Sequence, residues 1–222
     1  MTALPAAVLW DMDGTLVDTE PYWIAAEHEL VAAHGGTWSH EQALQLVGNS
    51  LLASARILQE AGVRLEPDEI VDYLLDRVVD AVRRHVPWRP GARELLAAIA
   101  EAGVPCALVT MSYRRFAAEV VAHTDGALRV VVTGDDVVNG KPHPESYLTA
   151  AQKLGVRVED CVAIEDSPTG ITSALASGAR TLGVEAVVPI EPRPGLSRAG
   201  SLERVTLRHL AQMRAGHVLD LP

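Results

Sequence analysis

The fold is decided by the stretch Val8-Leu9-Trp10-Asp11-Met12-Asp13-Gly14-Thr15 near the N-terminus. Its apolar half is typical of a buried β-strand, and two carboxylates and a glycine follow directly. Side chains two residues apart in a strand point the same way, so Asp11 and Asp13 can converge on one point, while Gly14 permits a sharp turn. Taken alone, this stretch leaves open an ordinary Asp-Gly turn after a buried strand.

Further polar groups follow other apolar runs in the same manner. Thr110 follows residues 106–109, Lys141 lies shortly after 130–133, and Glu165 and Asp166 follow 161–164. The carboxyl ends of parallel strands lie at one edge of an open sheet, where ligands bind. We therefore expect these groups to meet Asp11 and Asp13 at that edge.

The composition is that of an ordinary globular protein. The 222 residues are 48% hydrophobic, enough for a large core in one domain or in a core with an insertion. Lys and Arg number 19 against 29 Asp and Glu, a formal charge of −10, which disfavours nucleic acid and acidic membrane surfaces as partners. No apolar stretch is long enough to span a bilayer, and the first residues lack a basic, apolar leader. We expect a cytoplasmic monomer or weak dimer with no nucleic-acid or membrane partner.

Cysteine and histidine usage gives no sign of a disulfide framework or a zinc site. The two cysteines, Cys106 and Cys161, fall in expected core strands, where a small buried hydrophobic role is favoured. The eight histidines show no zinc-ligand spacing.

Apolar runs alternate with helical patterns over most of the chain, which predicts a parallel α/β sheet. The expected strands cover residues 6–10, 104–110, 130–133, 161–165 and 180–184. Crossover helices, each followed by a glycine, are expected at 92–102, 144–154 and 167–177. The proline-rich segment 188–200 is expected to form a late loop.

A different pattern separates the first strand from the others. Helical periodicity without an intervening strand covers residues 21–34, 41–47, 51–61 and 67–85. Prolines and a glycine interrupt this pattern at 86–91. The sequence therefore predicts a core of residues 1–17 with 89–222 and an all-helical insert of residues 18–88. The expected hinges lie at 17–20 and 86–91.

These motifs, in this order, resemble those of the haloacid dehalogenase (HAD) superfamily, in the helical-cap branch of beta-phosphoglucomutase and the sugar-phosphate phosphatases. The resemblance spans nearly the whole chain and is carried by Asp11-x-Asp13-Gly14-Thr15, Thr110, Lys141 and Glu165-Asp166. It implies an α/β fold with a Rossmann-like parallel sheet core and an inserted all-helical cap. In that strand order, the strands of Cys106 and Cys161 flank the first one about 10 Å apart, too far for a disulfide.

The acid residues and the resemblance together suggest covalent phosphoryl transfer. Asp11 is the expected nucleophile, forming an aspartyl phosphate, and Asp13 the expected general acid and base. Thr110 is expected to donate its hydroxyl to the phosphoryl oxygens and Lys141 to act as a cation beside them. The alternatives are a β-branched strand former for Thr110 and a solvated surface residue for Lys141.

A dianionic phosphate cannot approach several carboxylates unless a cation shares the space. Mg²⁺ prefers oxygen ligands, and the resemblance implies Asp11, the backbone carbonyl of Asp13 and Asp166 as its ligands. Glu165 is expected to lie nearby or to bind through water. The alternative for the Glu165-Asp166 pair is a helix N-cap before Ser167.

Substrate contacts are expected at two places. Gly14 and the backbone N–H groups of Met111 and Ser112, at the start of a helix, would face the phosphoryl group, with Arg114 within reach. In the insert, Trp23 and Asn49 are the candidates, although a tryptophan at helical spacing is also typical of a core residue.

The resemblance favours hydrolysis over phosphoryl return. Trp23 stands where the mutases carry a histidine, Leu51 stands where they carry a cap-loop arginine, and Thr15 matches the phosphatases. Arg56 could supply the missing cation. We expect a Mg²⁺-dependent phosphatase acting on a small phosphorylated metabolite, a sugar or polyol phosphate, with cap closure controlling access of water. The alternatives are a phosphomutase like beta-phosphoglucomutase and a non-enzymatic, phospho-accepting regulatory module.

Overall fold

The computed structural model describes residues 3–46, 50–186 and 189–222. The chain divides into two compact units, residues 1–18 with 87–222 and residues 19–86. The first unit contains the sheet, and the second contains helices with no strand among its described residues.

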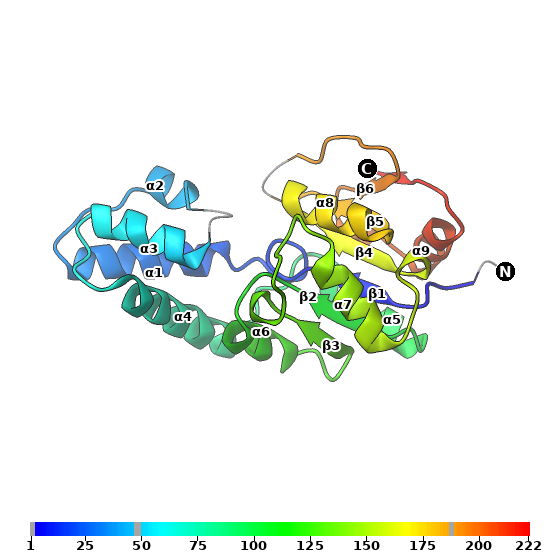
Figure 1. The fold of residues 1–222 in the computed structure, drawn as a ribbon, viewed down its shortest axis with the longest axis horizontal. Coiled ribbons are helices and arrows are strands. Elements are labelled where there is room, and N and C mark those ends of the chain that lie inside the picture. The colour runs from blue at the N-terminus through cyan, green and yellow to red at the C-terminus, as the bar shows by residue number, and fades with distance from the viewer. Residues whose placement is uncertain (1–2, 47–49, 187–188) are drawn as a thin grey trace. The chain divides into compact units, whose positions relative to one another are not determined.

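The described part of the first unit holds one parallel sheet of seven strands in the order β3-β2-β1-β4-β5-β6-β7 (Figure 1). The strands are β1 (Val8–Trp10), β2 (Cys106–Val109), β3 (Leu128–Val132), β4 (Val162–Glu165), β5 (Arg180–Val184), β6 (Leu196–Ala199) and β7 (Asp220–Leu221). The first strand lies between β2 and β4 and pairs with both in parallel. The expected α/β class is therefore confirmed.

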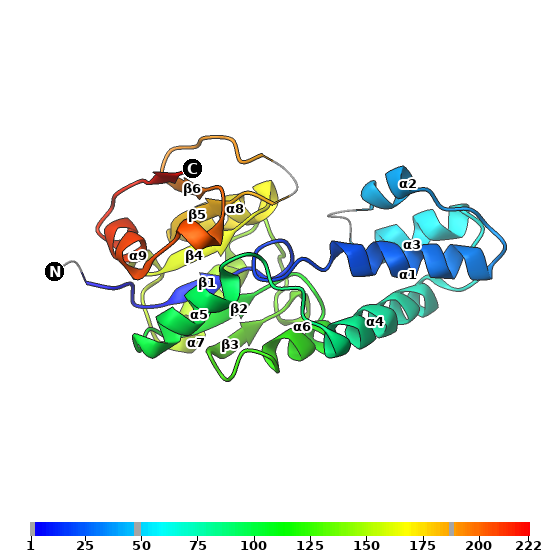
Figure 2. The same cartoon turned by 180° about the vertical axis from the view of Figure 1, so that it is seen from behind.

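Helices cover both faces of this sheet. One face carries α7 (Glu145–Leu154) and α8 (Pro168–Ser177), and the other carries α5 (Ala92–Glu101) and α9 (Leu207–Arg214) (Figure 1, Figure 2). Another helix, α6 (Arg114–Val121), connects β2 to β3. Because both faces are covered, every residue of β1, β2 and β4 is buried. This explains why these strands are apolar along their length rather than alternating, apart from Glu165 at the end of β4.

The C-terminal part of the sheet differs from the expectation. The loop predicted over 188–200 is wrong for residues 196–199, which form β6, and the two-residue β7 was not expected. Strand β6 contains Ser197 and Arg198 and has little apolar character of its own, but it pairs with β5 on one side and β7 on the other. Cys106 and Cys161 are buried free thiols, as expected.

The second unit packs its helices around α4 (Pro67–Arg84), which contacts both α1 (Glu20–Ala33) and α3 (Leu51–Glu60). The short α2 (His40–Leu44) lies against α1 and begins with a capping box at Ser39. The buried stripe of α4 repeats every three or four residues, as a helix with one apolar face requires; its members are Ile70, Val71, Leu74, Leu75, Val78, Val79 and Val82. None of the described helices is both long and apolar enough to cross a membrane.

Candidate active site

Asp11 lies at the carboxyl end of β1, in the centre of the sheet, and is 7% exposed. The following residues form a tight turn in which the N–H groups of Leu16 and Val17 both donate to the carbonyl of Met12. Gly14 has a φ of +87°, and a β-carbon there would lie 2.1 Å from Asp166 Oδ2. Glycine is therefore needed both for the turn and for the approach of Asp166.

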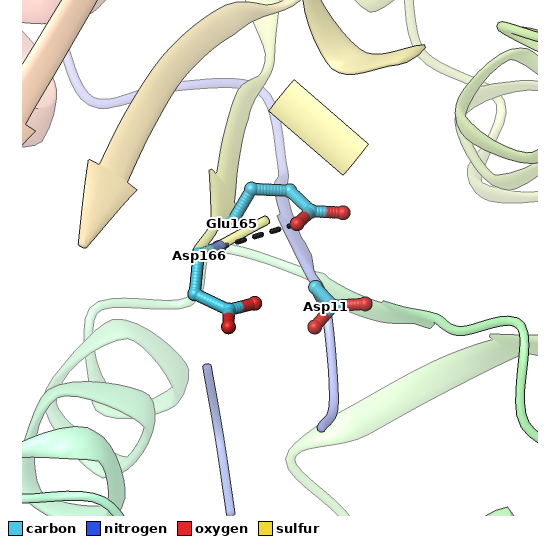
Figure 3. Close-up of side chains that lie close together, drawn as sticks. All are labelled: Asp11, Glu165 and Asp166. Atoms are coloured by element: carbon cyan, nitrogen blue, oxygen red, sulfur yellow. Dashed lines mark hydrogen bonds between the residues drawn. The ribbon is translucent and has the colours of Figure 1, made fainter. Parts of the chain in front are cut away.

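Three carboxylates gather at the carboxyl ends of β1 and β4. Asp11, Glu165 and Asp166 each offer an oxygen within 4.8 Å of the others, and Figure 3 shows them grouped beside the two strands. Asp166 accepts a hydrogen bond of 3.1 Å from the Thr15 hydroxyl. The first and fourth motifs, 150 residues apart, thus meet in one place, as the sheet topology predicts.

Lys141 is the cation of this cluster. Its buried ammonium donates to Asp11 Oδ1 at 2.6 Å, to Glu165 Oε1 at 2.6 Å and to the Val109 carbonyl at 3.0 Å. An ammonium has three protons, so all of its donors have partners. In this arrangement Lys141 neutralises Asp11; contact with a phosphoryl oxygen stays a prediction and requires the exchange of one of these partners.

Glu165 is fully buried and its oxygens are occupied by donors. Oε1 accepts from Lys141 and from the Tyr147 hydroxyl at 2.8 Å, and Oε2 accepts from the backbone N–H of Asp166 and from both the N–H and hydroxyl of Ser167. The N-cap of α8 is Ser167, whose side chain accepts from Gly170 N–H. The structure therefore contradicts the N-cap alternative for Glu165-Asp166.

The electrostatics of the cluster show a shortage of positive charge. Burial, reinforced by Glu165, raises the pKa of Asp11 well above its ordinary value, although Lys141 acts in the opposite direction. The same two causes raise the pKa of Asp166 to about 7. Burial opposes the charge on Lys141, but Asp11 and Glu165 together raise the pKa of its ammonium. Three carboxylates facing one ammonium can accept a further cation.

Asp13 contacts the link between β2 and α6. The Ser112 hydroxyl donates to Asp13 Oδ2 at 2.6 Å, and the Ser112 N–H donates to Thr110 Oγ1 at 3.0 Å. The Ser112 N–H predicted to face a phosphoryl group is therefore engaged by Thr110 in this structure. Thr110 is 1% exposed, and its hydroxyl accepts this bond while it retains its own proton for donation.

The comparisons with known proteins agree with this geometry. A family described as "haloacid dehalogenase-like hydrolase" matches residues 5–178, more than half of the chain. The chain belongs to this family. It is therefore an enzyme of the hydrolase class, and the resemblance stated from the motifs is confirmed.

Two relatives of this HAD-like hydrolase are named as phosphatases. A phosphorylated carbohydrates phosphatase of Thermotoga maritima is 33% identical over 178 residues, which cover 78% of this chain and 81% of the relative. Hexitol phosphatase A of Escherichia coli is 34% identical over 183 residues, covering 80% and 82%. Among solved structures, CbbY from Rhodobacter sphaeroides in complex with phosphate is 28% identical, with a TM-score of 0.79, covering 90% of this chain and 95% of that one.

Four further predicted site residues of the HAD-like hydrolase are Met111, Arg114, Trp23 and Asn49. The Met111 sulfur accepts a hydrogen bond from the backbone N–H of Lys141, and Arg114 forms an ion pair with Asp136. Trp23 lies on α1 in the helical unit, and Asn49 lies outside the described residues. The substrate-binding roles of all four stay predictions.

Sequence reasoning missed the residues that hold Glu165. Tyr147 is a buried aromatic on α7, and Gly170 lies in the first turn of α8, where its β-carbon would stand 1.8 Å from Glu165 Oε1. A helical tyrosine and a helical glycine have no pattern that distinguishes them from ordinary core residues. The nearest signal is the position of Gly170 five residues after Glu165, inside a helix, where glycine is otherwise unfavourable.

Proposed function

We propose that this hydrolase is a Mg²⁺-dependent phosphatase of a small phosphorylated metabolite, a sugar or polyol phosphate, acting through an aspartyl phosphate on Asp11. The observation that carries the proposal is the position of Asp11. Its carboxylate lies at the centre of the sheet edge, bound to Lys141 through one oxygen and grouped with Asp166. The carbohydrate and hexitol phosphatases among the relatives support the class of substrate.

The first step is attack by an Asp11 carboxylate oxygen on phosphorus. Lys141 keeps Asp11 oriented, and burial removes the water that would otherwise surround the nucleophile. As the bond from phosphorus to the ester oxygen breaks, Asp13 gives that oxygen a proton and the alcohol leaves. Thr110 donates its hydroxyl to a phosphoryl oxygen.

The second step releases the phosphate. Asp13, now a carboxylate, takes a proton from a water molecule whose oxygen attacks phosphorus, and the bond between phosphorus and Asp11 breaks. Inorganic phosphate leaves and Asp13 again carries the proton that the next cycle needs.

The donor set of the site fits a magnesium ion. Oxygen donors from carboxylates and a backbone carbonyl suit Mg²⁺, and the acid cluster has more negative charge than Lys141 balances. Asp11, the Asp13 carbonyl and Asp166 would hold the ion, which when bound neutralises the charge of the phosphate. We place Glu165 beside these ligands rather than among them, because its oxygens already accept several donors.

Substrate choice is assigned to the helical unit, residues 19–86, as the cap. Of the two predicted substrate contacts in this unit, Trp23 lies within the residues that the structure describes, and we propose it as a specificity residue. The cytoplasmic location and the monomer or weak dimer stay predictions of the sequence.

The test compares the wild-type enzyme with Asp11→Asn on a panel of phosphate esters. The panel holds hexose and hexitol phosphates, phosphoglycolate, nucleoside monophosphates and p-nitrophenyl phosphate, each with Mg²⁺ and with a chelator. We expect hydrolysis of a sugar or polyol phosphate by the wild type with Mg²⁺ alone. Asp11→Asn should lose about 10⁴-fold or more in kcat while it keeps its thermal unfolding temperature. Acid-quenched wild-type enzyme should carry one phosphoryl group by intact mass.

Two results would overturn the proposal. Efficient isomerisation of glucose 1-phosphate, after priming with a sugar bisphosphate, would make the enzyme a mutase. A phosphorylated Asp11 that persists for hours without turnover would instead indicate a regulatory module.

A further inference from the structure

The proposed general acid, Asp13, accepts a short hydrogen bond from a serine. The Ser112 hydroxyl lies 2.6 Å from Asp13 Oδ2, and both residues are partly buried. At this distance the serine hydroxyl donates a hydrogen bond to one oxygen of the carboxyl group. The contact therefore bears on the proton that Asp13 transfers.

Ser112 is held rigidly by its backbone. Its N–H donates to Thr110 Oγ1 at 3.0 Å, and its carbonyl accepts from the N–H of Gly134 at 3.2 Å. Gly134 approaches this link closely, since a β-carbon there would lie 2.5 Å from the Met111 carbonyl oxygen. Because both backbone groups have partners, the backbone of Ser112 is held beside Asp13, and the bond to Oδ2 fixes the rotation of the hydroxyl.

We propose that Ser112 is a positioning residue that selects the oxygen on which Asp13 carries the transferred proton. This inference rests on the proposed function, because it concerns the general acid of that reaction. In the proposed arrangement the Ser112 hydroxyl donates to Oδ2, and Oδ1 is the oxygen that carries the proton and delivers it to the ester oxygen.

The proton balance of the two steps follows from this choice. In the first step an Asp11 oxygen bonds to phosphorus and the bond from phosphorus to the ester oxygen breaks. The Oδ1–H bond of Asp13 breaks at the same time, and its proton goes to the ester oxygen. In the second step water gives its proton to Oδ1 while its oxygen bonds to phosphorus and Asp11 leaves. The bond from Ser112 to Oδ2 is kept throughout, so the carboxyl does not need to rotate between its two roles.

A competing role for Ser112 is direct contact with the substrate phosphate. The two roles predict different losses of activity when the leaving group of the ester is changed. A nitrophenolate leaves without a proton, whereas an alkoxide needs one, so a misplaced general acid affects alkyl esters selectively. A lost phosphate contact weakens all esters equally and also weakens the binding of inorganic phosphate.

The experiment measures kcat/KM of Ser112→Ala on benzyl phosphate and on p-nitrophenyl phosphate with Mg²⁺. We expect a loss of about 30-fold on benzyl phosphate and of less than about 3-fold on p-nitrophenyl phosphate, within the range that general acid catalysis contributes. Ser112→Thr, which keeps the hydroxyl, should restore benzyl phosphate hydrolysis to within about 3-fold of wild type. The inhibition constant of inorganic phosphate should stay unchanged.

Equal losses on the two esters would overturn the inference, as would a parallel rise in the inhibition constant of phosphate or a failure of Ser112→Thr to restore activity. Ser201→Ala, which removes a hydroxyl that caps the short helix at 202–204, is the matched control and should behave as wild type. If Ser112→Ala unfolds at assay temperature, Ser112→Cys provides the same comparison with a weaker donor. Failure of the proposed function itself is distinguishable, because the wild type would then hydrolyse neither ester.

Discussion

Gly170 and Glu165 lie so close together that no side chain fits between them. A β-carbon on Gly170 would stand 1.8 Å from Glu165 Oε1 and 2.1 Å from Oε2. The carboxylate therefore lies directly against the first turn of α8, where it also accepts bonds from Ser167. Because the same carboxylate binds the Lys141 ammonium, Gly170 helps to set the position of Lys141 through Glu165.

Gly170→Ala should destabilise the protein, although the same change inside a helix ordinarily stabilises it. Alanine is favoured over glycine in helices by about 1 kcal/mol, but here the methyl group would displace Glu165. We expect a net loss of about 1–3 kcal/mol in the free energy of unfolding, measured in urea, as in other overpacked sites. Phosphatase activity should fall at least about tenfold, because Lys141 moves with Glu165.

The matched control is Gly200→Ala. A β-carbon on Gly200 would meet its nearest atom at 3.5 Å, an ordinary contact, and its φ lies outside the left-handed region. The stability and activity of this variant should equal those of the wild type. A Gly170→Ala variant as stable as Gly200→Ala would contradict the close packing of Glu165.

Tyr147→Phe should weaken catalysis while it leaves the packing in place. The Tyr147 hydroxyl donates to Glu165 Oε1 at 2.8 Å, and the Lys141 ammonium lies 5.3 Å from the centre of its ring. Phenylalanine keeps the ring and removes the donor, so Glu165 loses one of its buried bonds. We expect a loss of about 1 kcal/mol in stability and of about 3- to 10-fold in kcat, measured on p-nitrophenyl phosphate.

Tyr73→Phe is a suitable control for this change. Tyr73 lies on α4 in the helical unit, where its ring contacts the Arg77 guanidinium. Its kcat should match that of the wild type. Equal kcat values for Tyr147→Phe and Tyr73→Phe would show that the Tyr147 hydroxyl does not help to hold the Lys141 ammonium.

The motif residues could be predicted from the sequence because each follows a strand. An apolar run that ends in Asp11 or in Glu165 predicts a buried strand. It also places the side chain at the carboxyl edge of the sheet, because the acid follows the end of that strand. Lys141 is harder to place, because eight residues separate it from the end of β3. Its place was inferred from the order of the motifs, and the hydrogen bonds to Asp11 and Glu165 explain it.

The supporting contacts could not be predicted, because they depend on packing between elements. The Ser112 hydroxyl and Asp13 are 99 residues apart in sequence, and their contact follows from the pairing of β1 with β2.

Strand β6 could not be predicted for a similar reason. Ser197 and Arg198 give it no apolar pattern, and pairing with its neighbours β5 and β7 makes it a strand. Tertiary contacts override local preference in such segments.

Glu27→Gln should change how stability depends on pH. Glu27 is 4% exposed, it accepts a bond of 3.2 Å from the Trp38 indole N–H, and burial, with a smaller contribution from Glu20, raises its pKa from 4.5 to about 7. The folded state therefore binds this proton more tightly than the unfolded state, so stability is highest below about pH 4.5 and falls as the pH rises toward 7. Glutamine still accepts the Trp38 bond and has no charge to bury. We therefore expect the free energy of unfolding of Glu27→Gln to fall about 2 kcal/mol less than that of the wild type as the pH rises toward 7.

The measurement is urea unfolding of the wild type and the variant between pH 5 and 8.5, with the difference between the two free energies plotted against pH. Glu29→Gln is the matched control, because Glu29 lies on the same helix in an exposed pair with Arg77 at 2.9 Å. Its difference from the wild type should be nearly flat over this range. A flat difference for Glu27→Gln as well would show that the Glu27 carboxyl keeps an ordinary proton affinity in the fold.

Asp166→Asn should weaken the response to magnesium more than it weakens the fold. Burial and the charge of Glu165 raise the pKa of Asp166 to about 7, so its ionised form is unfavourable until a cation compensates for it. Asparagine removes this proposed anionic ligand, and we expect the Mg²⁺ concentration for half-maximal activity to rise about 10- to 100-fold. The unfolding free energy without metal should stay equal or increase. Thr15→Val, which removes the hydroxyl bound to Asp166 at 3.1 Å, should give a smaller rise of about 3-fold, because it leaves the carboxylate in place and loosens only its orientation. Titration of activity with Mg²⁺ after chelation measures both. An unchanged magnesium response in Asp166→Asn would remove Asp166 from the ligand set, and the charge shortage around Asp11 would then need another explanation.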